Sequence, residues 1–168
     1  MVILAQVLAL FAILFWVISI LLKNKKNILL MQVIANGIYG IEYLLLGAFS
    51  AASMNFLSFL RLLVYYFYAL LNIKMPKWIL FVFIALVLLF GIITYDGLIS
   101  LLPIIITVLY TYAFWQNNLN VARIIYIVAA IIWIYYNYEV GAYVGIIGNA
   151  LEITTGLISL IKYRGGKK

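Results

Sequence analysis

Apolar runs of about 17 to 23 residues follow one another along nearly the whole chain, beginning with VILAQVLALFAILFWVISILL. Each run is long enough to cross the hydrocarbon core of a bilayer as a helix. Only 9% of the 168 residues are charged, whereas a soluble domain carries about 25%. The chain cannot cover its surface for water, and we therefore predict an all-α membrane protein.

Seven membrane-spanning helices are predicted from the positions of the polar breaks. The breaks are the lysine- and asparagine-rich residues 23–27, residues 74–77 with Pro76, the turn signal at residues 96–97 and the polar residues 116–118. The predicted spans are about 2–22, 28–46, 50–72, 78–94, 97–115, 122–137 and 141–162. The first span has no basic residue before it and lysines after it, so we expect a retained helix rather than a cleaved signal peptide.

The charges predict the orientation of these spans. With seven spans, ten of the eleven basic residues fall on one side of the membrane, in the first, third and fifth loops and the C-terminal tail. The loops on the other side carry Asp96 and Glu139. Because basic residues flank spans on the cytoplasmic side, we expect the N-terminus outside and the C-terminus in the cytoplasm. These flanking basic residues explain the net charge of +7, so we do not expect the chain to bind nucleic acid.

A short echo suggests an internal repeat. Residues 47–55 read GAFSAASMN, and residues 141–149, 94 positions later, read GAYVGIIGN. The same shift superimposes the first three spans on the last three without a gap. We predict a 3+1+3 arrangement with a first repeat at residues 1–72, a linker helix within 73–96, and a second repeat with a basic tail at 97–168. The linker helix makes the two repeats parallel about an axis along the membrane normal. Coincidence between apolar sequences is the alternative.

Four stretches of the chain resemble a known family. They are LAQVLALFAILFWVISI, YLLLGAFSAASMNFLSFLR, LLPIIITVLYTYAFW and IIWIYYNYEVGAYVG. Together they resemble the YgjV family of bacterial inner-membrane proteins, over nearly the whole chain. That family is grouped with the MtN3-like transporters, SWEET sugar carriers and PQ-loop proteins, so the resemblance implies a 3+1+3 fold and an inner-membrane location, but no substrate. The chain departs from the wider group because it lacks a proline–glutamine pair, and Pro103 is the only proline within a predicted span.

Two charged residues lie in the middle of predicted spans. Arg61 is in the third span and Glu152 in the seventh, and each charge costs at least about 2.5–3.5 kcal/mol at the bilayer centre. The repeat aligns Glu152 with Ser58, one turn from Arg61, so the two charges should have similar depth. We expect them to face each other or a common cavity. They either form a structural ion pair or bind a solute.

Amides and aromatic rings extend this candidate site. Asn55 and Asn149 are aligned by the repeat, as are Tyr39 and Trp133, and the last two suit stacking against a ring-bearing or cationic solute. The predicted solute-binding residues are Glu152, Arg61, Asn55, Asn149, Asn36, Tyr39 and Trp133. Hydrogen bonding between helices is the alternative role of the asparagines.

For three other features of the sequence we predict a structural role and no contact with a solute. Glu42, near the end of the second span, is expected to reach the membrane interface. The aromatic residues of 135–138 are expected in an interfacial belt. The glycines of the seventh span lie on one face, where they favour close helix packing.

These features favour transport over catalysis. The chain contains no histidine and no cysteine, so thiol chemistry, disulfides and the commonest metal ligands are missing. It also lacks a GxxxxGK nucleotide loop. We expect no enzyme, no cofactor and no metal, but a small secondary transporter or facilitator for an unidentified solute, with a site between the repeats. The alternatives are a non-transporting scaffold or partner subunit and, less favoured, an ion pore. The expected partners are the lipid bilayer and the solute. Assembly into a homo-oligomer is left open.

Overall fold

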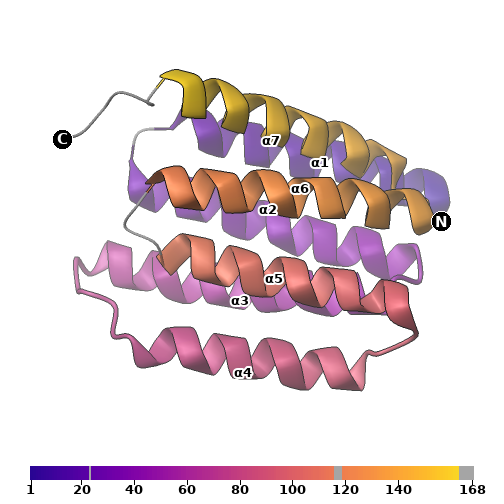
Figure 1. Ribbon diagram of the computed structural model, residues 1–168, viewed down its shortest axis with the longest axis horizontal. Coiled ribbons are helices and arrows are strands. Elements are labelled where there is room, and N and C mark those ends of the chain that lie inside the picture. Colours follow the sequence, from indigo (N-terminus) through magenta and orange to yellow (C-terminus); the bar gives the residue numbers. More distant parts are fainter. Residues whose placement is uncertain (23, 116–118, 163–168) are drawn as a thin grey trace.

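The computed structural model describes residues 1–22, 24–115 and 119–162, which form helices and no strand (Figure 1). The elements are α1 (Val2–Leu21), α2 (Lys25–Leu45), α3 (Phe49–Leu70), α4 (Trp78–Ile93), the 3-10 helix η1 (Leu98–Ser100), α5 (Leu101–Trp115), α6 (Leu119–Glu139) and α7 (Tyr143–Lys162). The all-α prediction is confirmed for these residues. Part of the predicted charge pattern, Lys23 and the tail from residue 163, lies outside them.

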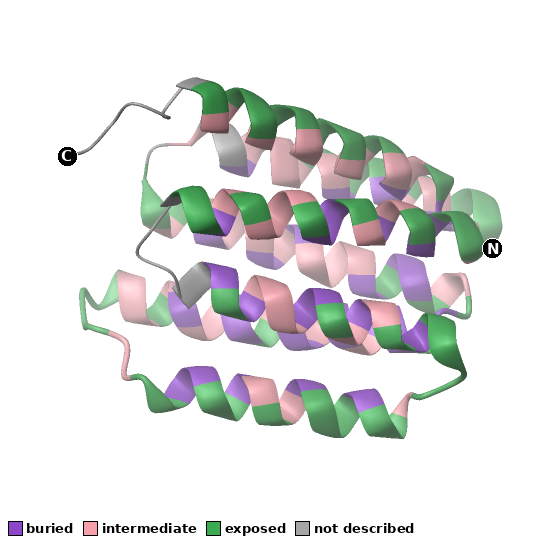
Figure 2. Cartoon of the chain, viewed as in Figure 1, coloured by how far each residue is buried: buried purple, intermediate pink, exposed green. Residues whose placement is uncertain are grey.

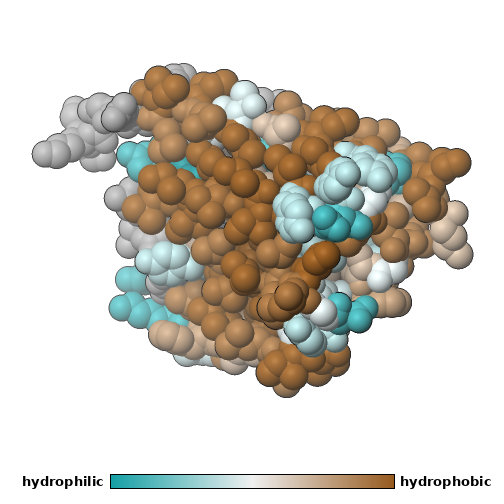
Figure 3. Space-filling model, turned by 45° about the vertical axis from the view of Figure 1, so that its right-hand side comes forward, coloured by the Kyte–Doolittle hydropathy of each residue, from teal (hydrophilic) through white to brown (hydrophobic). Residues whose placement is uncertain are grey.

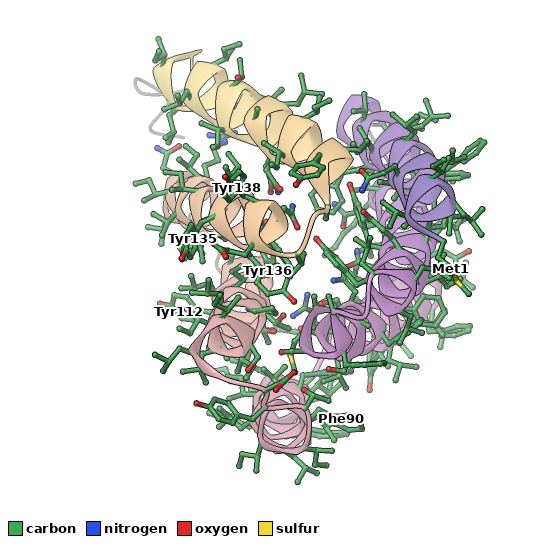
Figure 4. All side chains as sticks on the ribbon, turned by 90° about the vertical axis from the view of Figure 1, so that its right-hand side faces the viewer. Met1, Phe90, Tyr112, Tyr135, Tyr136 and Tyr138 are labelled. Carbon is green, nitrogen blue, oxygen red and sulfur yellow. The ribbon has the colours of Figure 1, made fainter. Side chains whose placement is uncertain are left out.

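Six helices form two layers around a common centre. In one layer α2 contacts α1 and α3, and in the other α6 contacts α5 and α7. The layers meet where α1 contacts α7 and where α3 contacts α5, and α4 packs outside the ring against α3 and α5. Figure 4 shows this ring along the helix axes. The centre of the ring is therefore enclosed by six helices from distant parts of the sequence.

The two ends of the bundle differ in charge and in their connections. α1 begins and α7 ends at opposite ends (Figure 1). One end, called the turn end below, holds the α2–α3 and α6–α7 turns. The other, called the basic end, holds the links from α1 to α2 and from α3 to α4. At the basic end the side chain of Asn24 caps α2 by accepting a hydrogen bond from the Lys26 backbone N–H at 3.0 Å.

Five helices, α1, α2, α3, α6 and α7, are long and apolar enough to cross a membrane. Helices α4 and α5 have 16 and 15 residues, fewer than the roughly 20 that a bilayer needs. They are short because α4 begins only after Pro76, and because the chain enters α5 through η1, after Gly97 with a φ of 93°. Five of the seven predicted spans thus have the required length.

The outer surface of the bundle is apolar, as lipid contact requires. Its large exposed side chains are mostly aliphatic or aromatic, and Figure 3 shows a face covered largely by hydrophobic residues. Figure 2 shows buried residues alternating with exposed ones along the helices, as expected for helices with one inward and one outward face. Tyr135 and Tyr138 are 55% and 65% exposed, as an interfacial belt requires, whereas Tyr136 is only 2% exposed. The belt prediction is wrong for Tyr136, because it lies on the inner face of α6 (Figure 4).

Small residues bring the helices together. A Cβ atom on Gly148 would lie 3.0 Å from Ile13 Cγ1 of α1, and one on Gly156 would lie 2.9 Å from Ile127 Cγ1 of α6. A cluster of alanines from α3 and α6 packs around Tyr43, Trp133 and Tyr136. These contacts fit the packing role expected for the glycines of α7, since close approach is how helices gain contact in a bilayer.

The echo in the sequence corresponds to two turns with the same geometry. Gly47 and Gly141 both have a φ of 74°, in the left-handed region that glycine enters at little cost. The Ala48 N–H donates to the Tyr43 carbonyl at 2.9 Å, and the Ala142 N–H donates to the Asn137 carbonyl at 2.8 Å. Each glycine thus ends one helix and lets the next begin after two residues, as in the common glycine-terminated helix ends.

Replacing either glycine by alanine should destabilise the fold by about 1 kcal/mol through backbone strain. Clash is not the reason, because no atom lies within 4 Å of a Cβ built at Gly47 or Gly141. Thermal unfolding in detergent should show a lower midpoint for Gly47→Ala and Gly141→Ala. The matched variants Gly47→Asn and Gly141→Asn should lose less, since asparagine tolerates this region. Alanine variants as stable as the parent would contradict this explanation.

Candidate functional site

A cavity of about 70 Å³ lies in the centre of the ring. Its walls come from all six ring helices and not from α4. The seven residues predicted from the sequence all line it: Asn36, Tyr39, Asn55, Arg61, Trp133, Asn149 and Glu152. The structure thus brings together residues that are up to 116 positions apart, from Asn36 to Glu152. Their role in binding a solute stays a prediction.

Arg61 is 2% exposed and is held against α5. Its Nη1 donates to the carbonyl oxygen of Thr107 at 3.4 Å and to the hydroxyl of Thr111, and its Nη2 donates to Ser58 Oγ at 3.4 Å. The Thr111 hydroxyl donates its own proton to the Thr107 carbonyl, so its lone pairs can accept from Arg61. These three acceptors of the guanidinium are neutral.

Glu152 faces the same turn of α5 from another helix. The Tyr110 hydroxyl lies 3.3 Å from both carboxylate oxygens of Glu152. Charge-assisted O–H···O⁻ bonds are normally about 2.5–2.7 Å long, so the contact with Tyr110 is weak. Since Tyr110 lies between Thr107 and Thr111 in the sequence, a single turn of α5 contacts both charged residues.

An aromatic and amide cluster closes the cavity toward the turn end. The Tyr43 hydroxyl donates to Asn137 Oδ1 at 2.6 Å, and Asn137 Nδ2 donates to Asn149 Oδ1 at 2.9 Å. Tyr43 also stacks on Trp133, with ring centroids 5.5 Å apart and planes at 13°. One face of Trp133 is thus covered by protein. Trp133 and Asn149, predicted as solute contacts, have an additional structural role here.

Two further ties join the layers at the turn end. Gln6 of α1 donates through Nε2 to the Gly141 carbonyl at 2.8 Å and accepts from the Val144 N–H at 3.0 Å. Ser50 of α3 donates to the Ser100 carbonyl at 2.8 Å. We call the Gln6, Ser50 and Tyr43 hydrogen bonds the turn-end latch. Together they hold α1, α2 and α3 to the opposite layer.

Several cavity and latch residues were not found by reasoning from the sequence. Their shared feature is a polar or aromatic side chain on an inward face: Gln6, Trp16, Ser100, Thr107, Tyr110 and Asn137. The 94-residue shift pairs Gln6 with Ser100 and Trp16 with Tyr110, so the same shift that aligned the predicted site residues also aligns these four. Asn137 was hidden within a segment assigned to the aromatic belt.

The prediction for Glu42 is wrong. Its side chain is 0% exposed, and neither carboxylate oxygen has a hydrogen-bond partner among the described residues. At this end of α2, the side chains that face lipid are those of Ile41 and Leu44, which are 47% and 45% exposed. Glu42 lies on a different face of a helix that has neighbours on both sides, so it has no route to the interface.

Glu42→Met should raise the free energy of unfolding by about 1 kcal/mol, because a buried polar group without a partner costs roughly 1–3 kcal/mol. The exposed Glu139, at the end of α6, provides the matched control, and Glu139→Met should leave the thermal midpoint unchanged. Both variants are compared with the parent by thermal unfolding in detergent. A clear loss of stability in Glu42→Met alone would show that the carboxyl group has a stabilising partner.

The comparisons with known proteins agree with the apolar helices and the family resemblance. The chain matches the Imp-YgjV family, described as "Bacterial inner membrane protein", over residues 3–167. No curated protein and no solved structure matches it. Because the match covers nearly the whole chain, this protein belongs to the YgjV family of bacterial inner-membrane proteins.

Proposed function

We propose that the chain is a small secondary transporter or facilitator whose solute binds in the central cavity. The observation that carries this proposal is the placement of Arg61 and Glu152 in the wall of one cavity, inside a bundle with an apolar exterior. Charged residues are expensive in a bilayer and mark solute paths when they face an internal cavity. Transport of this kind needs no catalytic residue and no cofactor from the chain.

We also propose that α1–α3 and α5–α7 are parallel repeats joined by α4. Support comes from contacts between positions related by the 94-residue shift. Tyr43 bonds to Asn137, its own equivalent, 94 positions away, as expected for a pair on a two-fold axis. The hydrogen bond between Gln6 and Val144 has its equivalent in the hydrogen bond between Ser100 and Ser50, because each residue of one pair is 94 positions from a residue of the other. A site between such repeats is typical of transporters that work by rocking one half against the other.

The proposed orientation has seven crossings, with the N-terminus outside and the C-terminus in the cytoplasm. Support comes from the described charges outside the cavity. Lys25, Lys26, Lys74 and Lys77 lie in or beside the links at the basic end, whereas Asp96 and Glu139 lie beside the links at the turn end (Figure 1). Basic residues favour the cytoplasmic side, so the turn end faces outward.

In this proposal the turn-end latch is the outer gate, because it joins the two layers at the end that faces outward. Its four hydrogen bonds contribute about 0.5–1.5 kcal/mol each, or roughly 2–6 kcal/mol together. Conformational equilibria with a minor state of about 0.1–10% differ by a few kcal/mol. The latch is thus strong enough to keep the outer end closed and weak enough to open during a transport cycle.

A non-transporting scaffold is the second candidate. It is favoured by the small size of the cavity, about 70 Å³, because pockets for drug-sized ligands measure about 300–1,000 Å³. In a scaffold the charged residues would serve only to hold the helices together. The two functions differ in whether the cavity ever opens to water.

Single cysteines in the cavity should react with a membrane-impermeant maleimide. The natural chain has no cysteine, so the Asn55→Cys and Asn149→Cys variants each carry one thiol. We expect labelling from the cytoplasmic side, in inside-out vesicles, at least about tenfold faster than for Ala52→Cys, since Ala52 is 0% exposed and outside the cavity. Cavity thiols that react no faster than this control from either side would favour the scaffold.

Breaking the latch should open the cavity to the outside. In the Asn149→Cys background, Gln6→Ala removes two hydrogen bonds and should speed labelling in right-side-out vesicles by about tenfold, the effect of roughly 1.4 kcal/mol. The control is Ser53→Ala, whose hydroxyl bonds within α3 and to Thr94. Equal labelling rates in the two variants would exclude Gln6 from an outer gate.

A further inference from the structure

We propose that the solute is a small zwitterion, with a carboxylate that binds Arg61 and an ammonium that binds Glu152. This inference rests on the transport function proposed above and specifies the solute class for the same cavity. It follows from the sign and the placement of the two charged groups in the cavity wall and from the amide oxygens that line the same cavity.

The two opposite charges are anchored separately. Arg61 bonds to Ser58, Thr107 and Thr111, and Glu152 bonds to Tyr110. Each of these partners is neutral, so the hydrogen bonds hold the charged groups in place without cancelling their charges. Because both residues line one cavity of about 70 Å³, a single small molecule can reach both.

The groups around each charge suit opposite ends of such a molecule. The guanidinium of Arg61 is a planar donor that matches a carboxylate. On the acceptor side, Asn36 and Asn55 each donate Nδ2 to a carbonyl of their own helix, four residues earlier, at 2.8 and 2.9 Å. Their amide oxygens therefore remain as acceptors on two residues of the cavity wall, in addition to the Glu152 carboxylate, and an ammonium can donate to such acceptors.

Other solute classes would leave a charge unmatched. An anion would pair with Arg61 but would meet the Glu152 carboxylate, and a cation would pair with Glu152 but would meet Arg61. A neutral solute would displace water from both charges and compensate neither. Since buried groups left unpaired discriminate strongly against the wrong ligand, the cavity favours a molecule that carries both charges.

The cavity volume limits the size of the solute. At about 70 Å³, it is well below the roughly 300–1,000 Å³ of pockets for drug-sized ligands. Glycine and alanine are the smallest zwitterions with an ammonium and a carboxylate, so they are the solutes to test first. A ring-bearing solute, which the pair of Tyr39 and Trp133 suggested from the sequence, would require the cavity to expand, and Trp133 is already stacked on Tyr43.

The test uses a set of molecules of nearly equal size. Purified full-length protein is given radiolabelled glycine, both in detergent for binding and in proteoliposomes for uptake, with protein-free liposomes as the control. Competitors are glycolate, ethanolamine and ethylene glycol, in which a hydroxyl replaces the ammonium, the carboxylate or both. We expect each to compete at least about tenfold more weakly than glycine or alanine. Equal or better competition by any of the three would overturn the proposal.

Variants at the two charges should change the preference and not only the affinity. Glu152→Gln should shift the ratio of glycolate to glycine binding about tenfold toward glycolate, because the positive charge of Arg61 remains. Arg61→Gln should shift preference toward ethanolamine for the converse reason. The control Thr154→Ala changes an exposed residue of α7 and should shift neither ratio. If Arg61→Gln does not fold, the Glu152→Gln ratio decides, and an unchanged ratio would overturn the assignment.

The cysteine experiments separate this inference from the proposed function. Cavity thiols that become labelled while glycine and alanine both fail to bind at millimolar concentration would leave transport in place and reject a small zwitterion. Unlabelled thiols together with absent binding would reject both. Labelled thiols with glycine binding and the two expected shifts in preference would support both.

Discussion

The fold depends on satisfying polar groups inside a bundle that has no water around it. In a bilayer each unsatisfied group costs several kcal/mol, and in this chain one turn of α5 supplies partners to both charges of the centre. Thr107 and Thr111 accept from Arg61, and Tyr110 donates to Glu152. Helix α5 can serve both α3 and α7 because the two layers curve around a shared centre. The position of this helix thus determines the cavity.

The rest of the architecture supports that placement with small residues and shared turns. Glycines at 148 and 156 let α7 approach α1 and α6 closely, and alanines let the aromatic cluster fill the turn end. The latch then joins the layers at this end through Gln6, Tyr43 and Ser50. The cavity thus lies between two layers that are joined by hydrogen bonds at one end, which is the arrangement on which the proposed outer gate depends.

Much of the candidate site could be predicted because a charge or amide in an apolar run is conspicuous. Arg61, Glu152, Asn55 and Asn149 stand out for that reason, and the repeat suggested a common depth. Tyr110 and Thr107 could not be separated in this way from the many aromatic and hydroxyl residues of the chain, since only their neighbours show that they face inward. The prediction for Glu42 was wrong because the burial of this residue depends on which face of α2 is covered by neighbouring helices.

The sequence by itself determined the class of protein, the helices and the turns between them. Hydrophobic length and charge bias act locally, so the apolar runs, the breaks at Pro76 and Gly97, and the repeated motifs that begin at Gly47 and Gly141 can be recognised without a fold. Only the tertiary structure decided which helices meet. The pairing of α1 with α7 and of α3 with α5 brings residues from six helices to one cavity, and it depends on close contacts of side chains distant in sequence. Those contacts have no local signature, because the same polar residue can face lipid, a neighbour or the centre according to how its helix is turned.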